Sequence, residues 1–250
     1  MREPGIQGRV VPVVEIGPAD ARSMYEIFAR HYDCVSLEQF QRDLSEKDYG
    51  LVLRSANGAI CGFSTQKVLR VSVGGTPVRA VFSGDTIVDR AYWGEQELGR
   101  CWCRYVSSVY WEEPDVPLYW FLISKGYRTY LYLPLFFEAF YPNCEASTPA
   151  FEQRLLDTLA AAKFPDHYRR ETGLIEFPRS QGQLKPHLAE IPARRLRDPH
   201  VQFFLKRNPA YATGHELACL AEISPLNMKL FAGRILGQAQ APQPLCQGAD

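Results

Sequence analysis

The stretch that decides the fold runs from residue 78 to residue 111 and reads VRAVFSGDTIVDRAYWGEQELGRCWCRYVSSVYW. Residues 78–88 are rich in β-branched and aromatic side chains and predict a strand. A short turn with Gly94 follows, and residues 96–110 predict an amphipathic helix. The first N–H groups of a helix have no partner within it, and the helix dipole adds partial positive charge there. The turn therefore predicts a site for negative charge, such as the pyrophosphate of a nucleotide or of coenzyme A.

The overall composition is that of an ordinary globular chain. Of its 250 residues 46% are hydrophobic and 22% are charged, which fits one large domain or two small ones. The formal net charge is +0, from 28 basic and 28 acidic residues, so the balance favours neither nucleic acid nor an anionic membrane as a partner. The basic groups at 169–170 and 194–197 are short and lack interleaved aromatic residues, so they predict a solvated face.

Targeting and metal-binding signals are absent from the sequence pattern. Residues 1–5 lack the apolar region of a signal peptide, and no segment reaches the roughly 20 apolar residues of a membrane span, so we expect a cytoplasmic protein. The seven cysteines are an odd number without paired spacing, which predicts free thiols in a reducing compartment. His167, His187, His200 and His215 show no ligand spacing, so no metal is predicted.

The first half of the chain predicts two helices followed by an antiparallel meander. We expect a strand at 10–16 and helices at 21–32 and 36–47, the second opened by a capping-box pattern at Ser36 and Gln39. Three strands follow at 50–55, 59–73 and 76–88, and the second is expected to bend near Lys67. Asn57-Gly58 and Gly74-Gly75 predict the two hairpin turns that join them.

The second half has weaker patterns. We expect a buried strand at 118–123, a loop at 124–127, a helix at 132–140 and a helix at 149–162. Residues 164–188 are polar and rich in turn residues, which predicts irregular structure. Further expectations are strands at 201–206 and 216–223, a terminal helix at 227–236, and a disordered tail over residues 238–250.

This order of elements, with a glycine turn after the fourth strand, resembles the Gcn5-related N-acetyltransferase (GNAT) superfamily. The residues that carry the resemblance are TIVDRAYWGEQELG, residues 86–99, and it extends over roughly residues 10–142. It implies an α/β (α+β) fold, in which a mixed, mostly antiparallel sheet is flanked by helices and followed by a C-terminal extension. The implied parts are a GNAT-like acyltransferase core at 1–142, an extension completing or covering it at 143–237, and the tail.

In that family the turn offers backbone amides to the coenzyme A pyrophosphate, and the next strand, here 118–123, splays from the fourth to admit the pantetheine arm. The resemblance therefore implies cofactor contacts at Val88, Arg90, Gly94, Gln96, Leu98 and Gly99. Aligned on Gly99, the glycine that the family has two residues earlier is Glu97 in this chain. A glutamate beside a pyrophosphate opposes binding unless it points to solvent or caps its own helix.

The resemblance also implies catalytic residues. Asp85, on the fourth strand, is placed to act as base on the incoming amine. The alternative interpretation is a bulge at residues 83–86 with Asp85 bonded to the backbone. Tyr132 is preferred as the acid that protonates the leaving thiolate, in competition with Tyr127 and Tyr130.

Ser124, which ends the strand at 118–123, is placed to bind the pantetheine arm or the thiolate. His31 and Tyr32 lie where the first two helices meet, a region that often shapes the acceptor pocket in this family. The alternative for His31 is a histidine that stabilises the carbonyls at its helix end.

The implied function is an N-acyltransferase that moves an acyl group from acetyl-CoA or another acyl-CoA to a small-molecule amine. The aromatic-rich segment 127–141 and the C-terminal extension give a looser likeness to long-chain N-acyl amino acid synthases, which take the acyl group from an acyl carrier protein. Glu97 motivates a third alternative, a non-catalytic GNAT-like binding protein. Because many relatives dimerise, a homodimer is a further expectation.

Overall fold

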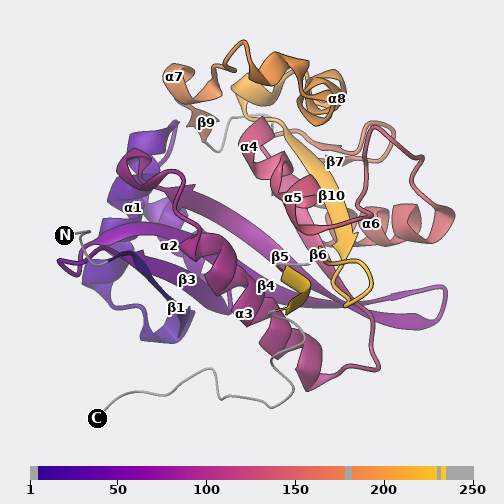
Figure 1. Ribbon diagram of the computed structural model, residues 1–250, viewed down its shortest axis with the longest axis horizontal. Helices are drawn as coiled ribbons and strands as arrows, with labels where there is room; N and C mark the ends of the chain where they lie inside the picture. The colour runs from indigo at the N-terminus through magenta and orange to yellow at the C-terminus, as the bar shows by residue number, and fades with distance from the viewer. Residues whose placement is uncertain (1–4, 178–181, 230–231, 235–250) are drawn as a thin grey trace.

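The computed structural model describes residues 5–177, 182–229 and 232–234, and its centre is one large sheet (Figure 1). The described strands of this sheet lie in the order β1-β3-β4-β5-β6-β10-β8-β7. In chain order they are β1 (Gln7–Pro12), β3 (Tyr49–Arg54), β4 (Ile60–Val73), β5 (Thr76–Val88), β6 (Leu118–Ser124), β7 (Tyr168–Arg169), β8 (Leu174–Ile175) and β10 (Glu216–Glu222). The pairing of β5 with β6 is parallel, whereas the other printed pairings of this sheet are antiparallel. Because β10 pairs with β6, the segment after residue 143 supplies strands to the same sheet.

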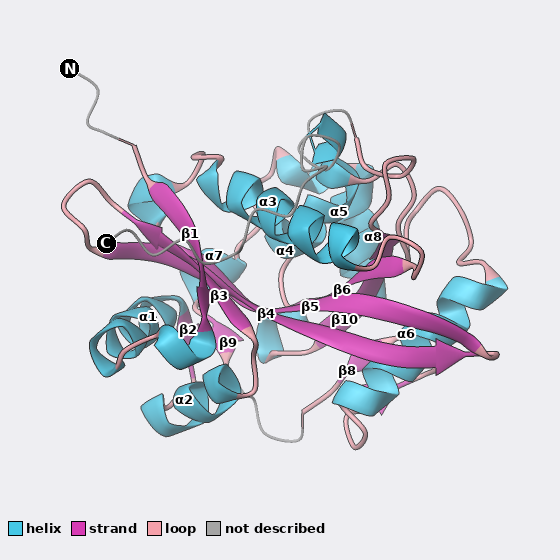
Figure 2. Cartoon of the chain, turned by 90° about the horizontal axis from the view of Figure 1, so that it is seen from below, coloured by secondary structure: helices cyan, strands magenta, loops and turns pink. Residues whose placement is uncertain are grey.

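Helices cover both faces of the sheet (Figure 2). They are α1 (Pro18–His31), α2 (Leu37–Ser45), α3 (Glu97–Glu112), α4 (Tyr127–Tyr130), α5 (Tyr132–Phe136), α6 (Ala150–Lys163), α7 (Pro186–Ala189) and α8 (Pro199–Arg207). Buried residues of α3, α4, α5 and α8 form one core with β6 and β10, whereas α6 packs on the opposite face and α1 with α2 on Phe63 and Ile87. Alternation along β6 explains the division, since Trp120 faces the first core and Phe121 the second.

A small second sheet ties the N-terminal helices to the C-terminal extension. It pairs β2 (Tyr32–Asp33) with β9 (Gln183–Leu184), antiparallel. Since β2 follows directly on α1, this pairing fixes the end of α1 next to the loop after β6, where Gly182 lies against Lys125 and Tyr32.

A bulge in β5 is the local feature that opens the sheet. The parallel pairing with β6 runs only from Arg79↔Leu118 to Ser83↔Leu122, whereas β5 continues along β4 as far as Val88. The register with β4 shifts at Gly84 and Asp85, because Ser83 pairs with Gln66 but Thr86 with Ser64. The bulge predicted at residues 83–86 is therefore present, and β5 and β6 part directly after it.

Buried polar groups hold this bulge in place. Trp120 Nε1 donates to Ser83 Oγ at 2.8 Å, and Ser83 Oγ donates to Gln66 Oε1 at 2.7 Å. The Gln66 amide in turn donates to Ser64 Oγ, which is bonded to Thr86 Oγ1 at 2.6 Å. A chain of satisfied hydrogen bonds thus crosses three strands, and removing one member would leave buried groups without partners.

The meander follows the sequence prediction closely. β5 has the predicted bounds, and β3 and β4 differ from theirs by one residue at most at each end. Gly58, Gly74 and Gly75 all have positive φ, as the predicted hairpin turns require. Ser36 caps α2 by accepting from the N–H of Gln39, although the Gln39 side chain donates to Asp43 instead of returning to the cap.

Several predictions in the second half were wrong. Residues 201–206 form helix α8 instead of a strand, because Asp198 caps the helix, Pro199 opens it, and Val201 and Phe204 are buried three residues apart. The helix expected at 132–140 ends at Phe136, and Phe137 then bridges Met228. The strand expected at 10–16 ends at Pro12 and continues as a 3₁₀ turn.

The C-terminal predictions are tested only in part. Residues 227–229 form a turn and a bridge, so no helix begins at Asn227 as expected. The rest of the helix predicted at 227–236 is described only at residues 232–234, and the tail predicted at 238–250 lies outside the described residues.

Candidate functional site

A cavity of about 690 Å³ lies where β5 and β6 part. Its walls are the end of β5, the turn before α3, the first turn of α3, α4, α5 and the end of α1, with Leu188, Arg195 and Tyr211 from the extension. We call it the large cavity. Of the residues predicted for the site, it brings together His31, Tyr32, Val88, Gly94, Gln96, Leu98, Gly99 and Tyr132.

The N-terminus of α3 opens into this cavity without a side-chain cap. Gln96, the N-cap residue, makes no capping hydrogen bond, and Leu98 and Gly99 in the first turn line the cavity. Gly94 has φ +101°, a conformation that glycine adopts at little cost, so the chain turns sharply into the helix there. The arrangement provides backbone N–H donors and the positive end of the helix dipole, which suit an anion such as a phosphate.

Glu97 is held away from the large cavity. Its Oε1 accepts hydrogen bonds from Gly8 N at 3.1 Å and from the Arg104 guanidinium at 2.9 Å, on the side of β1. The side chain is 19% exposed and is not part of the cavity lining. The carboxylate therefore neither points to solvent nor caps its own helix, and Arg104 balances its charge.

Basic side chains at the cavity were missed by the sequence analysis. Arg128 lies 4.5 Å from the centre of the Trp93 ring and lines the large cavity, as do Arg195 and Lys229. Arg195 belongs to the basic group that was interpreted as a solvated face. Arg128 is the second residue of the short helix α4, and only its position soon after the predicted strand at 118–123 could have pointed to it in the sequence.

Arg90, by contrast, is exposed and does not line the cavity. Its guanidinium lies 5.9 Å from the centre of the Trp93 ring. The phosphate contact predicted for Arg90 is therefore not supported by its position. Arg128 lies against the same indole ring and does line the cavity.

Beyond Ser83 no described strand pairs with the β6-facing edge of β5, although Trp93 Nε1 donates a hydrogen bond to Val88 O at 2.8 Å. Asp89 N donates to Cys61 O on β4 at 2.8 Å. Because successive N–H groups of a strand point to opposite edges, the Val88 N–H points away from β4, to the side from which β6 has departed. Val88 lines the large cavity, so its N–H is available to an oxygen atom of a ligand.

The structure separates the three tyrosines. Tyr130 donates its hydroxyl to Pro142 O at 2.8 Å and is fully buried, so it has a packing role. Tyr127 and Tyr132 both line the large cavity. The Tyr127 hydroxyl is buried and has no hydrogen-bond partner among the described residues, while burial raises the pKa of Tyr132. A phenol with a raised pKa keeps its proton at neutral pH and can donate it.

Ser124 lies elsewhere. Its side chain is fully buried, and Oγ is 3.9 Å from Cys219 Sγ on the neighbouring strand β10. It lines neither the large cavity nor the pocket around Asp85. The alternation of side chains along β6 turns Ser124 into the core, which does not support the predicted contact with pantetheine or thiolate.

A second, smaller pocket surrounds Asp85. It has a volume of about 120 Å³ and shares Tyr32, Thr86 and Thr129 with the large cavity, so the two adjoin. We call it the Asp85 pocket. Its charged lining residues are Asp43, Lys47, Asp85, Lys125, Lys163 and Glu216.

Burial and neighbouring charges shift the pKa values of Asp85 and Lys47 in this pocket. Burial raises the pKa of Asp85 to about 6, an effect that the nearby Lys47 and Lys125 oppose. Burial also lowers the pKa of Lys47, against the attraction of Asp85. Lys125 is paired with Glu216 at 3.3 Å. The Asp85 carboxylate is therefore poised to gain or lose a proton near neutral pH, and no backbone group is found bonded to it among the described residues.

The two residues predicted for the acceptor side, His31 and Tyr32, differ in the regions that they line. Tyr32 lines the large cavity and the Asp85 pocket, and its pKa is raised by burial and further by Asp85 and Glu216. His31 lines only the large cavity, and its Nδ1 is bonded to Ile27 O at 2.9 Å. The alternative expected for His31, a contact with the carbonyls at its helix end, is therefore present.

Comparison with solved structures finds distant similarity. The chain is 14% identical to a probable N-acyltransferase from Enterococcus faecalis (TM-score 0.41), over 54% of this chain and 33% of that one. It is 18% identical to a GNAT family N-acetyltransferase from Escherichia coli in complex with CoA (TM-score 0.35; 50% and 67%). It is 11% identical to the Saccharomyces cerevisiae N-myristoyltransferase with bound myristoyl-CoA (TM-score 0.37; 48% and 31%).

The chain thus spans about a third of the length of two of these proteins. No family model matches the sequence, and no curated protein matches it either. Within the described residues, no helix is long and apolar enough to cross a membrane. With identities this low and TM-scores below 0.5, the activity has to be inferred from this chain's own residues. The structure has the mixed, mostly antiparallel sheet flanked by helices that was expected from the sequence, with β5 parting from β6 and a glycine turn before α3.

Proposed function

We propose that this protein is an N-acyltransferase that moves an acyl group from acyl-CoA to an amine. The observation that carries the proposal is the large cavity, which joins the uncapped N-terminus of α3 to the gap between β5 and β6. The adjoining Asp85 pocket supplies a carboxylate whose pKa of about 6 suits a general base at neutral pH. Two ligands can meet where the two hollows share Tyr32 and Thr86.

The donor would occupy the large cavity from the α3 end inward. The pyrophosphate suits the N–H groups of residues 97–99, and the basic side chains of Arg128 and Arg195 suit the remaining phosphate charge. The pantetheine arm contains amides that can pair with the free edge of β5. Leu131, Leu135 and Phe136 give the far wall an apolar character that suits an acyl chain.

In the reaction, the Asp85 carboxylate accepts a proton from the amine, directly or through water, and the amine nitrogen attacks the thioester carbonyl carbon. The tetrahedral oxyanion accepts a hydrogen bond from the Val88 N–H. The C–S bond then breaks, the amide is released, and Tyr132 gives its phenolic proton to the departing thiolate. The hydroxyl of Tyr127, which has no partner in the described structure, is the competing acid.

A melting-temperature titration with coenzyme A, acetyl-CoA and a long-chain acyl-CoA tests the donor. A ligand that binds only the folded state raises the melting temperature, and about 100-fold excess over Kd is worth about 2.7 kcal/mol. A rise of several degrees is expected, and the ranking of the three ligands indicates the acyl length. No rise with any of them would remove acyl-CoA as donor and leave acyl carrier protein to be titrated in its place.

Turnover with a panel of amines then separates an enzyme from a non-catalytic binding protein. That alternative rested on Glu97, and the bonds from Glu97 to Gly8 and Arg104 supply another role for this side chain. Thiol release that depends on both donor and amine is the expected result. Binding of acyl-CoA without release for any amine in the panel would favour the accessory role.

A further inference from the structure

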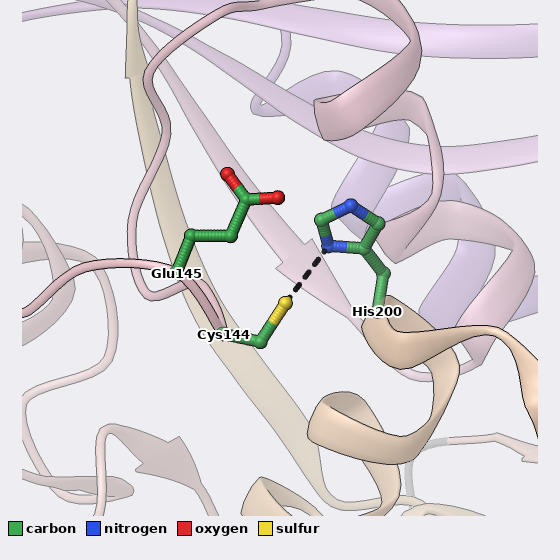
Figure 3. Close-up of side chains that lie close together, drawn as sticks. All are labelled: Cys144, Glu145 and His200. Atoms are coloured by element: carbon green, nitrogen blue, oxygen red, sulfur yellow. Dashed lines mark hydrogen bonds between the residues drawn. The ribbon is translucent and has the colours of Figure 1, made fainter.

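Three side chains outside the lining of the large cavity lie close together. Cys144, Glu145 and His200 each offer one potential ligand atom, and these atoms all lie within 4.8 Å of one another (Figure 3). Cys144 Sγ is 3.4 Å from His200 Nδ1. No sequence spacing predicted this cluster, because 56 residues separate the thiol from the imidazole.

The segment that carries Cys144 and Glu145 is rigidly anchored. Asn143 Oδ1 accepts from the N–H groups of Glu145 and Ala146, both at 2.8 Å, and Asn143 Nδ2 donates to Phe140 O at 2.6 Å. Just before it, Tyr141 exchanges two backbone hydrogen bonds of 2.7 Å with Leu220 on β10. The thiol and the carboxylate are thus presented by a fixed turn.

His200 is held equally firmly, in the first turn of α8. Its backbone N–H donates to the capping Asp198 carboxylate at 3.0 Å, and its ring packs on Phe140 with centroids 5.7 Å apart. Because Phe140 touches both segments, the ring orientation of His200 is linked to the turn at Asn143. Such preorganisation lowers the cost of collecting ligands around an ion.

The atom set and its spacing suit a divalent ion of intermediate softness. Thiolate sulfur, imidazole nitrogen and carboxylate oxygen are the three ligand types of zinc. Zinc bonds of about 2.3 Å to sulfur and about 2.0 Å to nitrogen in a tetrahedron place those two ligand atoms about 3.5 Å apart. The observed 3.4 Å between Cys144 Sγ and His200 Nδ1 already matches that separation. A carboxylate oxygen of the exposed Glu145 lies within 4.8 Å of both of these atoms and is the third potential ligand.

We propose that Cys144, Glu145 and His200 bind one zinc ion, with a fourth position left to water. Binding exchanges the thiol proton of Cys144 for the metal and releases it to solvent, while the imidazole binds in its neutral form. The ion would link the turn at Asn143 to α8. Tyr130 of α4 contacts both linked segments, because its hydroxyl donates to Pro142 O and its ring packs on Phe204. The metal would therefore also stabilise α4, which forms part of the wall of the large cavity.

The test is a zinc titration of the full-length, reduced protein against a chromophoric chelator. We expect one saturable site, a rise in melting temperature with zinc, and at least about a tenfold weaker affinity in Cys144→Ser and in His200→Ala. Matched controls are Cys34→Ser, the other exposed thiol of the described chain, and His187→Ala, an exposed histidine of α7, both with unchanged affinity. Carrying Cys246→Ser in every protein removes the remaining cysteine that lies outside the described residues.

Cobalt gives an independent readout that does not depend on stability. Co²⁺ bound to a thiolate produces a charge-transfer absorption, which should be present in the wild type and in Glu145→Gln but absent in Cys144→Ser. Because the Cys144 and Glu145 side chains are exposed, these two variants should keep the melting temperature of the metal-free wild type. No saturable site, or zinc affinity unchanged in Cys144→Ser, would overturn the proposal.

Discussion

The large cavity and the Asp85 pocket adjoin, yet they are built in different ways. The large cavity depends on backbone: an uncapped helix end, an unpaired strand edge and a glycine with positive φ. The Asp85 pocket depends on side-chain charges brought from α2 and the turn after it, β5, the loop after β6, α6 and β10. A backbone site tolerates changes of side chain and suits a constant ligand such as a nucleotide carrier. A site made of six charged side chains can be altered one residue at a time, which suits a variable acceptor.

The largest effect that this comparison predicts is on catalysis in Asp85→Asn. Removing a general base typically costs 10²–10⁴-fold in rate, so kcat should fall by about that amount while the Kd for acyl-CoA stays within about twofold. Steady-state kinetics measures the fall in kcat, and a titration with acyl-CoA on the same preparation measures the donor Kd. Asp33→Asn, which changes an exposed carboxylate on β2 next to Tyr32, is the matched control and should leave both quantities unchanged. A parallel loss of donor binding would show that the two regions are not separable.

The pH dependence of kcat is a second test of Asp85 as the general base. Since the pKa of Asp85 is raised to about 6, wild-type kcat should rise as pH increases through about 6 and then level off. The rate measured from pH 5 to 8 should lose this step in Asp85→Asn, whose residual activity should be flat in the same range. A wild-type profile without a step near 6 would argue against Asp85 as the base.

Asp85→Asn should increase the stability of the fold, although it lowers kcat. Asp85 has a higher pKa in the folded chain, about 6, than its ordinary 3.8, so the ionised carboxylate opposes folding. The cost is absent below about pH 4, grows as pH rises and is complete above about pH 6, where a shift of this size amounts to at most about 3 kcal/mol. Asp85→Asn should therefore raise the free energy of unfolding at pH 8 and lose that advantage near pH 4. Urea unfolding at the two pH values measures it.

The way each region is assembled also determined how well it could be predicted. The strand and the turn before α3 are local, so hydrophobic pattern and turn chemistry predicted them, and the family resemblance then pointed to Gly94 and Val88, which line the large cavity. Lys47, Lys125 and Glu216 come together only because three separate strands and loops pack there, and no local pattern marks them.

The errors have the same origin. Residues 201–206, with one valine and two phenylalanines, were predicted as a strand, but the cap at Asp198 and the packing of Phe204 on Tyr130 favour a helix. Tertiary contacts and the cap overrode local propensity there. The role predicted for Ser124 from its place at a strand end stays a prediction, and the side to which the strand turns its side chain was not readable from spacing.

A smaller effect is expected from two tyrosines of the large cavity, Tyr127 and Tyr132. If Tyr132 protonates the leaving thiolate, Tyr132→Phe should lower kcat by about 10–100-fold with an unchanged donor Kd, because only the proton donor is lost. Tyr127→Phe is the matched variant. It should cost less than threefold, since its buried hydroxyl has no partner to lose. Reversed magnitudes would assign the acid role to Tyr127.

The smallest effect separates two arginines that flank one indole ring. Arg128 lines the large cavity and lies 4.5 Å from the Trp93 ring centre, whereas Arg90 lies 5.9 Å from it and outside the lining. A charge-assisted phosphate contact at an exposed site is worth about 1.4 kcal/mol, so Arg128→Gln should weaken coenzyme A binding by about tenfold, and less at high salt. Arg90→Gln should stay within about twofold in the same titration. Because both variants remove one positive charge beside the same indole ring, a difference between them can come only from reach into the cavity. Equal losses would mean that the phosphates are held by the general field around the α3 N-terminus, and the backbone would then carry almost all of the donor's specificity.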